Sequence, residues 1–100
     1  MSWKVYIVKC ADDSYYTGIS TDVEMRIKMH NEGKGAKYTR GRGPVILEEA
    51  KDFGDRSSAL KEEYRIKQLS RKKKELVIGE WRVDRLRCEY VYDPEDNEDE

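Results

Sequence analysis

The chain has 100 residues, which is enough for one domain with a modest core and too few for two. Charged residues make up 41% of it and apolar residues 37%, but ten aromatic side chains and clear apolar periodicity argue against wholesale disorder. No apolar run approaches the roughly 20 residues that span a bilayer, and the N-terminus lacks the basic and apolar regions of a signal peptide. We therefore expect an intracellular protein without a membrane segment.

The formal net charge of −1 hides an uneven distribution of charge along the chain. Residues 93 to 100 contain six of the 21 acidic groups, so residues 1 to 92 carry 20 basic against 15 acidic side chains, a net charge of +5. A run of like charge is usually a solvated tail. The sequence predicts one basic domain over residues 1–92 and an acidic, disordered tail over residues 93–100. An internal mimic of nucleic acid is the alternative role of that tail.

Two short runs near the N-terminus, Trp3 to Lys9 and Tyr15 to Ser20, have the residue types of β-strands. The residues between them, Ala11 to Ser14, are small or acidic, which is typical of a hairpin turn. A hairpin built from these runs places Tyr6 and Tyr16 on neighbouring strands.

A helix is predicted directly after the second strand. Thr21 is followed three residues later by Glu24, which is the spacing of a capping box. On the helical wheel, Arg26 and His30, the only histidine of the chain, lie along one edge of the apolar stripe. A guanidinium beside a core face needs a carboxylate or a phosphate as partner, unless it reaches water along its aliphatic stem. Both interpretations of Arg26 stay open on this helix alone.

The segment from Asn31 to Pro44 contains four glycines and a proline, so no regular element is expected there. Glycine lets backbone N–H groups approach an anion, arginine pairs bidentately with phosphate, and a tyrosine ring offers a stacking surface to a base. We interpret the segment as a nucleic-acid contact loop, with a flexible soluble linker as the alternative. The predicted contact residues are Lys34, Lys37, Tyr38, Thr39, Arg40 and Arg42.

Three further elements are predicted in the second half of the chain, besides the helix considered next. Val45 to Lys51 is expected to be a third strand, at the edge of the sheet because it contains two glutamates. Arg71 to Ile78 is expected to be a helix with four basic residues at its start. In Trp81 to Tyr92, apolar or aromatic side chains recur at every second residue from Leu86 onward, which predicts a late strand.

A helix is also predicted from Arg56 to Leu69, capped by Asp55 or Ser57. Glu63 falls near the middle of the apolar arc of this helix. A carboxylate there is unfavourable unless it is paired, hydrogen-bonded or bound to a metal. Its partner is therefore either Arg26 of the first helix, in a salt bridge, or a hard cation such as Mg²⁺ or Mn²⁺.

In combination, these segments resemble the GIY-YIG endonuclease superfamily. The resemblance is carried by Val5-Tyr6-Ile7, by Tyr16-Thr17-Gly18 and by the run from Asp22 to Asn31. Residues 33–44 and 58–71 look most like its small single-domain (UPF0213-like) branch. That branch is similar to the nuclease domain of the structure-specific endonucleases that act on branched DNA.

The resemblance implies a small α/β (α+β) fold in which a three-stranded antiparallel sheet is flanked by helices. It also implies a phosphodiesterase that uses Mg²⁺ or Mn²⁺, with Glu63 as the metal ligand and Gly18 as the motif glycine. We expect Tyr6 to act as the base and Tyr16 to position the water or the phosphate, in roles that are interchangeable. We expect Arg26 to stabilise the developing charge. The implied catalytic set is Tyr6, Tyr16, Arg26, His30 and Glu63, with His30 as a proton carrier.

Three functions are compatible with these residues. The first is a divalent-metal-dependent endonuclease that hydrolyses phosphodiester bonds in DNA, in repair or recombination. The second is a non-catalytic nucleic-acid-binding module with the same fold, and the third is a protein-interaction domain in which Arg26 and Glu63 form a structural pair. The five-residue set favours the first, because neither alternative needs all five. Nucleic acid, and DNA in the first place, is the expected partner; nothing indicates a protein partner.

Overall fold

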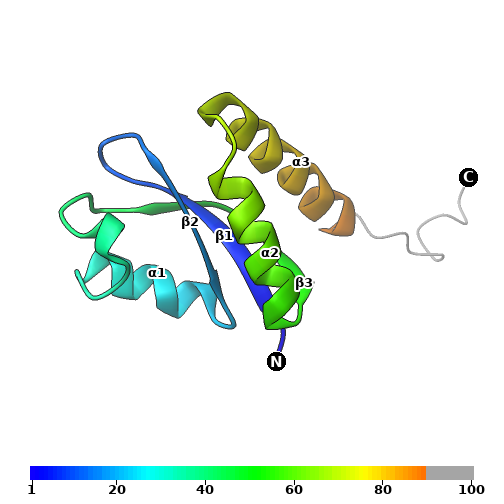
Figure 1. The fold of residues 1–100 in the computed structure, drawn as a ribbon, viewed down its shortest axis with the longest axis horizontal. Helices are drawn as coiled ribbons and strands as arrows, with labels where there is room; N and C mark the ends of the chain where they lie inside the picture. The colour runs from blue at the N-terminus through cyan, green and yellow to red at the C-terminus, as the bar shows by residue number, and fades with distance from the viewer. Residues whose placement is uncertain (90–100) are drawn as a thin grey trace, which may run out of the picture.

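The computed structural model describes residues 1 to 89 and has a three-stranded antiparallel sheet at its centre (Figure 1). Its strands are β1 (Trp3–Lys9), β2 (Tyr15–Ser20) and β3 (Ile46–Gly54), in the order β2-β1-β3. The predicted fold class is therefore confirmed, as are both strands of the hairpin and the edge position of the third. β3 begins one residue after the predicted start and continues to Gly54, which pairs with Trp3.

The sheet has two buried faces because β1 carries four consecutive buried residues, from Val5 to Val8. Side chains alternate between the faces of a strand. Val5 and Ile7 point to one face, and Tyr6 and Val8 point to the other, so each pair belongs to a different apolar cluster. This alternation separates a purely structural core from the face that carries the tyrosines.

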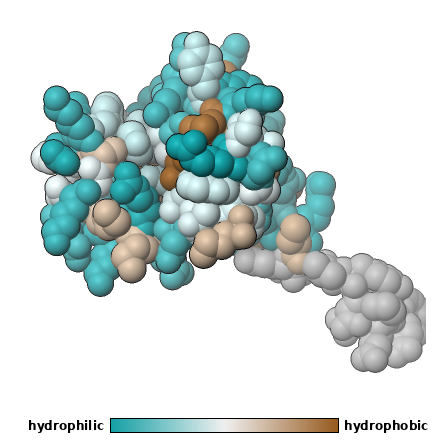
Figure 2. All heavy atoms as spheres, turned by 60° about the horizontal axis from the view of Figure 1, so that its bottom comes forward, coloured by the Kyte–Doolittle hydropathy of each residue, from teal (hydrophilic) through white to brown (hydrophobic). Residues whose placement is uncertain are grey.

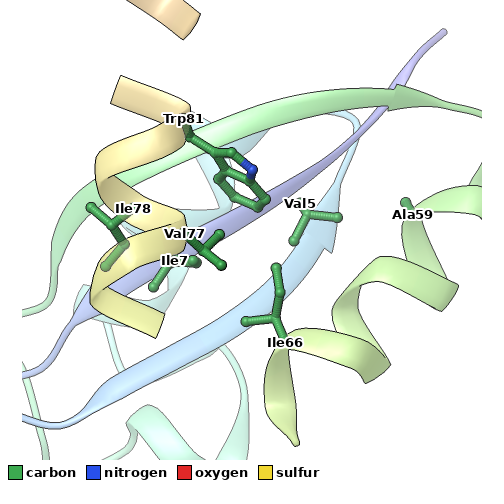
Figure 3. Close-up of a cluster of buried hydrophobic side chains, with 7 residues drawn as sticks. All are labelled: Val5, Ile7, Ala59, Ile66, Val77, Ile78 and Trp81. Atoms are coloured by element: carbon green, nitrogen blue, oxygen red, sulfur yellow. The ribbon is translucent and has the colours of Figure 1, made fainter. Parts of the chain in front are cut away.

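The structural core lies beneath the last two helices, α2 (Arg56–Lys67) and α3 (Arg71–Glu89). Figure 3 shows their side chains converging on the strands. Ile66 of α2 and Val77 and Trp81 of α3 are almost completely buried there. The core is made by Val5, Ile7, Ala59, Ile66, Val77, Ile78 and Trp81.

The other face of the sheet is covered by α1 (Val23–Asn31) (Figure 1). Its N-cap is Asp22, whose side chain accepts a hydrogen bond of 3.1 Å from the backbone N–H of Met25. The predicted capping box at Thr21 is therefore wrong by one residue, because the Asp22 carboxylate reaches the free N–H group. In α2 the cap is Asp55, one of the two predicted residues, which accepts from the N–H of Ser58.

The predicted late strand is wrong within the described residues, because α3 continues as a helix to Glu89. Its buried residues Val77 and Trp81 are four apart, which is the spacing of one helical face. Tyr90 and Tyr92, which completed the period-two pattern, lie outside the described residues, as does the proposed acidic tail.

Two smaller differences concern the ends and the loop. α2 ends at Lys67 rather than at Leu69. The segment predicted to lack regular structure contains one short 3₁₀ helix, Lys37–Thr39. No helix within residues 1–89 is long and apolar enough to cross a membrane. Hydrophilic side chains dominate the face shown in Figure 2, and hydrophobic ones form only small patches on it.

Candidate active site

Three of the predicted site residues meet on the α1 face of the sheet. Tyr6 pairs with Gly18 across the hairpin and Val8 pairs with Tyr16, so both tyrosines point to the same face. His30 reaches them from the last turn of α1, with ring centroids 5.9 Å from Tyr6 and 5.5 Å from Tyr16. The chain thus brings together side chains that are 24 residues apart.

A hydrogen bond joins the Tyr6 hydroxyl to Nε2 of His30 at 2.7 Å. The other ring nitrogen, Nδ1, accepts a hydrogen bond of 3.2 Å from the backbone N–H of Ala36. Because a backbone N–H only donates, Nδ1 is unprotonated, and the proton of the neutral ring is on Nε2. The geometry therefore assigns His30 as the donor and the Tyr6 oxygen as the acceptor, which leaves the Tyr6 proton free to point elsewhere.

The imidazole is held in the neutral state by its surroundings. Burial lowers the pKa of His30, and the positive charge of Arg26 lowers it further. The neutral ring holds the Tyr6 hydroxyl in place through its hydrogen bond at Nε2. The proton-carrier role that the sequence suggested for His30 stays a prediction.

The loop after α1 is wrapped around this imidazole. The Thr39 hydroxyl is 2.9 Å from Nδ1 of His30 and 2.8 Å from the carbonyl oxygen of Ala36, so its single proton has two acceptors. A Cβ at Gly35 would overlap the imidazole ring. Thr39 is only 1% exposed. The prediction that its side chain contacts nucleic acid is therefore wrong, because that side chain faces the interior.

Gly18 leaves the space that the Tyr6 ring occupies. A Cβ at this position would lie 2.5 Å from the Tyr6 hydroxyl oxygen and 2.6 Å from the carbon that bears it. Any side chain would push the phenol away from β2. The motif glycine is thus a condition for the placement of the Tyr6 hydroxyl.

Arg26 and Glu63 approach the same hydroxyl from different helices. Burial raises the pKa of Tyr6 to about 12, and Tyr16 adds to the rise. The Arg26 guanidinium acts in the opposite direction, and the Glu63 carboxylate raises this pKa slightly. Both charges therefore lie within electrostatic reach of Tyr6.

The interhelical salt bridge considered from the sequence is not formed. Within residues 1–89 the ion-pair partner of Glu63 is Lys67 of its own helix, at 3.4 Å, and Arg26 is not within 4.0 Å of that carboxylate. The Glu63 side chain is only 17% exposed. Its burial is therefore compensated by a lysine, and Arg26 remains available in the site.

The donor set fits a hard ion that keeps most of its water. No group of three or more histidine, cysteine, aspartate or glutamate side chains suited to a metal occurs in the described part of the chain. Mg²⁺ is commonly held by one or two carboxylates, several waters and substrate phosphates. Glu63 alone meets that requirement, as it does for the similar ion Mn²⁺, whereas a structural zinc site needs four protein ligands.

A stack of side chains covers the outer edge of the site. The rings of Tyr16 and Tyr38 are stacked at 5.8 Å with an interplanar angle of 23°, and the Arg42 guanidinium lies 4.1 Å from the Tyr38 ring centroid. Arg42 also donates to Asp12 at 2.9 Å and to the Tyr38 carbonyl oxygen at 2.7 Å. Arg42 therefore holds the loop against the hairpin and is less available to a phosphate than predicted.

The remaining cations of the loop are directed to solvent. Lys34, Lys37 and Arg40 are exposed and form no ion pair with any described residue. Lys37 begins the short 3₁₀ helix that carries Tyr38, and Arg40 directly follows it, positions compatible with the predicted contact role.

Sequence reasoning assigned no role to several residues that build the site. Asn31 accepts from the Val45 N–H at 2.6 Å and donates to the Val45 carbonyl oxygen, which ties the end of α1 to the start of β3. Lys67 lies over the Tyr16 ring at 5.4 Å. Its place one turn after Glu63 was a signal available in the sequence.

The GIY-YIG family model, which describes the GIY-YIG catalytic domain, matches residues 2–75. The chain is a member of the GIY-YIG family. The resemblance seen in the sequence is thereby confirmed. The matched residues include both tyrosines, Gly18, Arg26, His30 and Glu63.

Several GIY-YIG relatives carry the name UPF0213. UPF0213 protein VNG_2274C of Halobacterium salinarum is 56% identical over 74 residues, which are 74% of this chain and 96% of that protein. UPF0213 protein YhbQ of Escherichia coli is 48% identical over 81 residues, which are 81% of each protein. These names state no activity, so membership shows the type of domain and leaves cleavage by this chain to be tested.

Solved structures of similar proteins have the same fold. The solution NMR structure of the UPF0213 protein BH0048 from Bacillus halodurans is 52% identical, with a TM-score of 0.52 over 79% of this chain and 84% of that chain. The solution NMR structure of protein EF2693 from E. faecalis is 40% identical, with a TM-score of 0.59 over 83% of this chain and 88% of that chain. The α+β fold of the GIY-YIG domain is thus shown for this chain by sequence and structure together.

Proposed function

We propose that this GIY-YIG protein is a divalent-metal-dependent endonuclease that hydrolyses phosphodiester bonds in DNA. One observation carries the proposal. The Tyr6 hydroxyl accepts a hydrogen bond from His30 and lies within electrostatic reach of the charges of Arg26 and Glu63. Hydrolysis needs a base for the attacking water and positive charge for the phosphate. The site offers a candidate for each.

Tyr6 is the base of this mechanism. A phenol with a pKa of about 12 is protonated at neutral pH, so its deprotonated form has to be stabilised. The N–H of His30 donates to the Tyr6 oxygen, and the Arg26 guanidinium favours the phenolate. His30 is a positioning residue here, because it contacts the Tyr6 hydroxyl and acts on the attacking water only through that phenol.

Arg26 and Glu63 are the residues that neutralise the charge of the phosphate in this mechanism. The guanidinium of Arg26 is free of ion pairs within residues 1–89 and suits bidentate pairing with phosphate oxygens. Glu63 would hold a Mg²⁺ or Mn²⁺ ion, which would supply Lewis-acid neutralisation of phosphate charge. Tyr16, half-buried beside Tyr6, positions the water or the phosphate.

DNA is the proposed partner, and the loop of residues 33–44 is the proposed contact. Exposed cations supply affinity for the phosphate backbone, and the partly exposed Tyr38 ring offers a stacking surface. We infer a role in repair or recombination only from the resemblance of the sequence to nucleases of branched DNA. The alternative is a non-catalytic binding module, which has no need of a buried hydrogen bond between Tyr6 and His30.

Cleavage assays on defined substrates test the proposal. The full-length protein is incubated with labelled flap, junction, single-stranded and duplex DNA, and with RNA of the same sequences, in Mg²⁺, Mn²⁺ or EDTA. We expect cleavage of DNA with either metal and none with EDTA. Binding without cleavage under every condition would favour the non-catalytic module.

Two substitutions test whether Arg26 and Glu63 take part in cleavage. We expect Arg26→Ala and Glu63→Gln each to lower the cleavage rate by about 100-fold or more, because each removes charge stabilisation of the reacting phosphate. Glu62→Gln is the matched control, since Glu62 is on the same helix, is 18% exposed and pairs with Arg65 instead. Equal rates for the Glu63→Gln and Glu62→Gln variants would exclude Glu63 from the site.

A further inference from the structure

Lys67 is the last residue of α2 and lies between the carboxylate of Glu63 and the ring of Tyr16. Its Nζ is 3.4 Å from Oε2 of Glu63 and 5.4 Å from the centroid of Tyr16. The lysine side chain is 44% exposed, whereas that of Glu63 is 17% exposed. The ammonium group therefore occupies the solvent side of a mostly buried carboxylate.

The contact between Lys67 and Glu63 is a single, loose one. On the same helix, Arg65 holds Glu62 with two hydrogen bonds, of 3.0 Å and 2.5 Å. Glu63 accepts no hydrogen bond from any described residue and has only the lysine as its counter-charge. A lysine is a point charge on a flexible stem, so this partner is easily exchanged.

Two cations close to Glu63 disfavour each other. A divalent ion on this carboxylate and an ammonium group a few ångströms away repel each other. Without either cation, a mostly buried carboxylate is left uncompensated. The carboxylate therefore needs one cation and disfavours two.

We propose that Lys67 is an exchangeable counter-cation of Glu63. It neutralises the carboxylate in the metal-free protein and competes with the divalent ion for it. Once displaced, the ammonium group stays beside Tyr16 and becomes a ligand of the substrate phosphate, since lysine binds phosphate as a point charge. The second half of this inference rests on the proposed nuclease function, and the first half does not.

The proposal gives two effects of opposite sign for one substitution. Replacing Lys67 by methionine removes the competitor, so the metal binds more tightly, but it also removes the phosphate ligand, so cleavage slows. A purely structural lysine would weaken both properties when lost. An ordinary surface ion pair would change neither appreciably.

Mn²⁺ binding to the full chain without nucleic acid tests the first half. Free Mn²⁺ is measured by electron paramagnetic resonance for the wild type, Lys67→Met and the control Lys61→Met. Lys61 is an exposed lysine of the same helix that forms no ion pair with any described residue. We expect about fivefold tighter binding for Lys67→Met, from the lost ion pair and the lost repulsion together, and less than about twofold change for Lys61→Met.

The Glu63→Gln substitution tests whether the gain in Mn²⁺ affinity arises at Glu63. Combining it with Lys67→Met should abolish the gain in affinity, because the carboxylate for which Lys67 competes is gone. Any Mn²⁺ bound by acidic groups elsewhere in the chain is common to all variants. A Lys67→Met protein that binds Mn²⁺ no more tightly than Lys61→Met overturns the proposal. So does a gain that persists in the double variant.

Cleavage at saturating Mn²⁺ tests the second half. We expect a loss of about tenfold or more for Lys67→Met and a smaller loss for Lys67→Arg, which retains a positive charge. Unchanged cleavage by Lys67→Met overturns the phosphate-ligand role while the nuclease function stands. A wild type that never cleaves removes the nuclease function, while the Mn²⁺ result still decides the exchange of cations.

Discussion

Tyr6 is only 1% exposed, yet its hydroxyl is the atom around which the other site residues are arranged. Its environment contains opposing influences on the pKa. Burial and Tyr16 favour the neutral phenol, while Arg26 favours the phenolate. Since burial prevails, the free protein holds Tyr6 in the protonated form near neutral pH, and the phenolate is scarce.

A base that is protonated in the free protein makes the reaction faster at higher pH. With a pKa of about 12 for Tyr6, we expect kcat/KM to rise about tenfold per pH unit between about pH 6 and about pH 9, without a plateau. A flat profile over this range would contradict a role for Tyr6 as the base.

Hydroxide attack would give the same slope, so variants of Tyr6 are needed as controls. Tyr6→Phe should abolish the pH-dependent activity. Incorporation of a fluorotyrosine at position 6, whose phenol is more acidic, should raise the rate at a given pH below the pKa of the native phenol.

The site residues differ in how far the sequence alone could place them. The positions of Tyr6, Tyr16 and His30 follow from strand alternation and helix period, which are local properties. Which nitrogen of His30 carries the proton depends on the N–H of Ala36, which is six residues away in an irregular loop. The interior position of Thr39 depends on the same loop path, so counting polar side chains could not reveal it.

At the scale of elements, Glu49 of β3 holds α3 against the sheet. Its carboxylate is buried and accepts hydrogen bonds from Arg82 at 3.0 Å and from Arg85 at 3.1 Å. Burial by itself raises the pKa of Glu49, but Arg85 and Arg82 outweigh it, so this pKa is lowered. The ionised form is therefore favoured by folding.

Loss of that charge should destabilise the protein in a pH-dependent way. Because the pKa of Glu49 is lower in the folded than in the unfolded state, this stabilisation is complete above the unfolded value, about 4.5. It is lost as pH falls through the folded value. We expect Glu49→Gln to lower the free energy of unfolding by about 1–2 kcal/mol at pH 7, because both arginines are half-exposed and return to water.

Urea unfolding between pH 7 and about pH 2.5, a range that extends below the lowered pKa of Glu49, measures this difference. The gap between the wild type and Glu49→Gln should shrink toward the acid end. Glu80→Gln is the control, since Glu80 is an exposed residue of α3 that forms no ion pair with any described residue. A gap that stays constant with pH would show that Glu49 does not act through its charge.

The same contacts explain why the late strand was predicted wrongly. A period-two pattern of four residues is weak evidence, and two of the four lie outside the described residues. Arg82 and Arg85 are three apart and reach one carboxylate only from a helix. The partner, Glu49, is more than 30 residues earlier in the chain, so this long-range contact was not visible in the local pattern.

For the whole molecule, the arrangement of charge matters more than the net value of −1. On the side of α3 and β3 several cations are already paired with carboxylates, as Lys51 is with Asp84. In the loop of residues 33–44, three cations are exposed without such partners in residues 1–89. The sequence predicted a basic domain, and the structure locates part of its unpaired charge in the loop that carries Tyr38.

This distribution predicts the salt dependence of DNA binding. The logarithm of the affinity falls linearly with the logarithm of salt concentration, with a slope of about −0.7 to −0.9 per phosphate contacted. If Lys37 and Arg40 each contact one phosphate, replacing both by alanine should reduce the slope by about 1.5 and weaken binding to all sequences alike. Fluorescence anisotropy of labelled DNA, in EDTA to prevent cleavage, gives both quantities.

Lys51→Ala separates a specific contact loop from a general effect of net charge. It removes one cation, but that cation is paired with Asp84 at 3.2 Å on the side away from the loop. For the Lys51→Ala variant, the slope of log affinity against log salt concentration should equal that of the wild type. If Lys51→Ala lowered the slope as much per charge as the loop variant, DNA would be held by the overall field of the protein. The loop would then be a solvated linker.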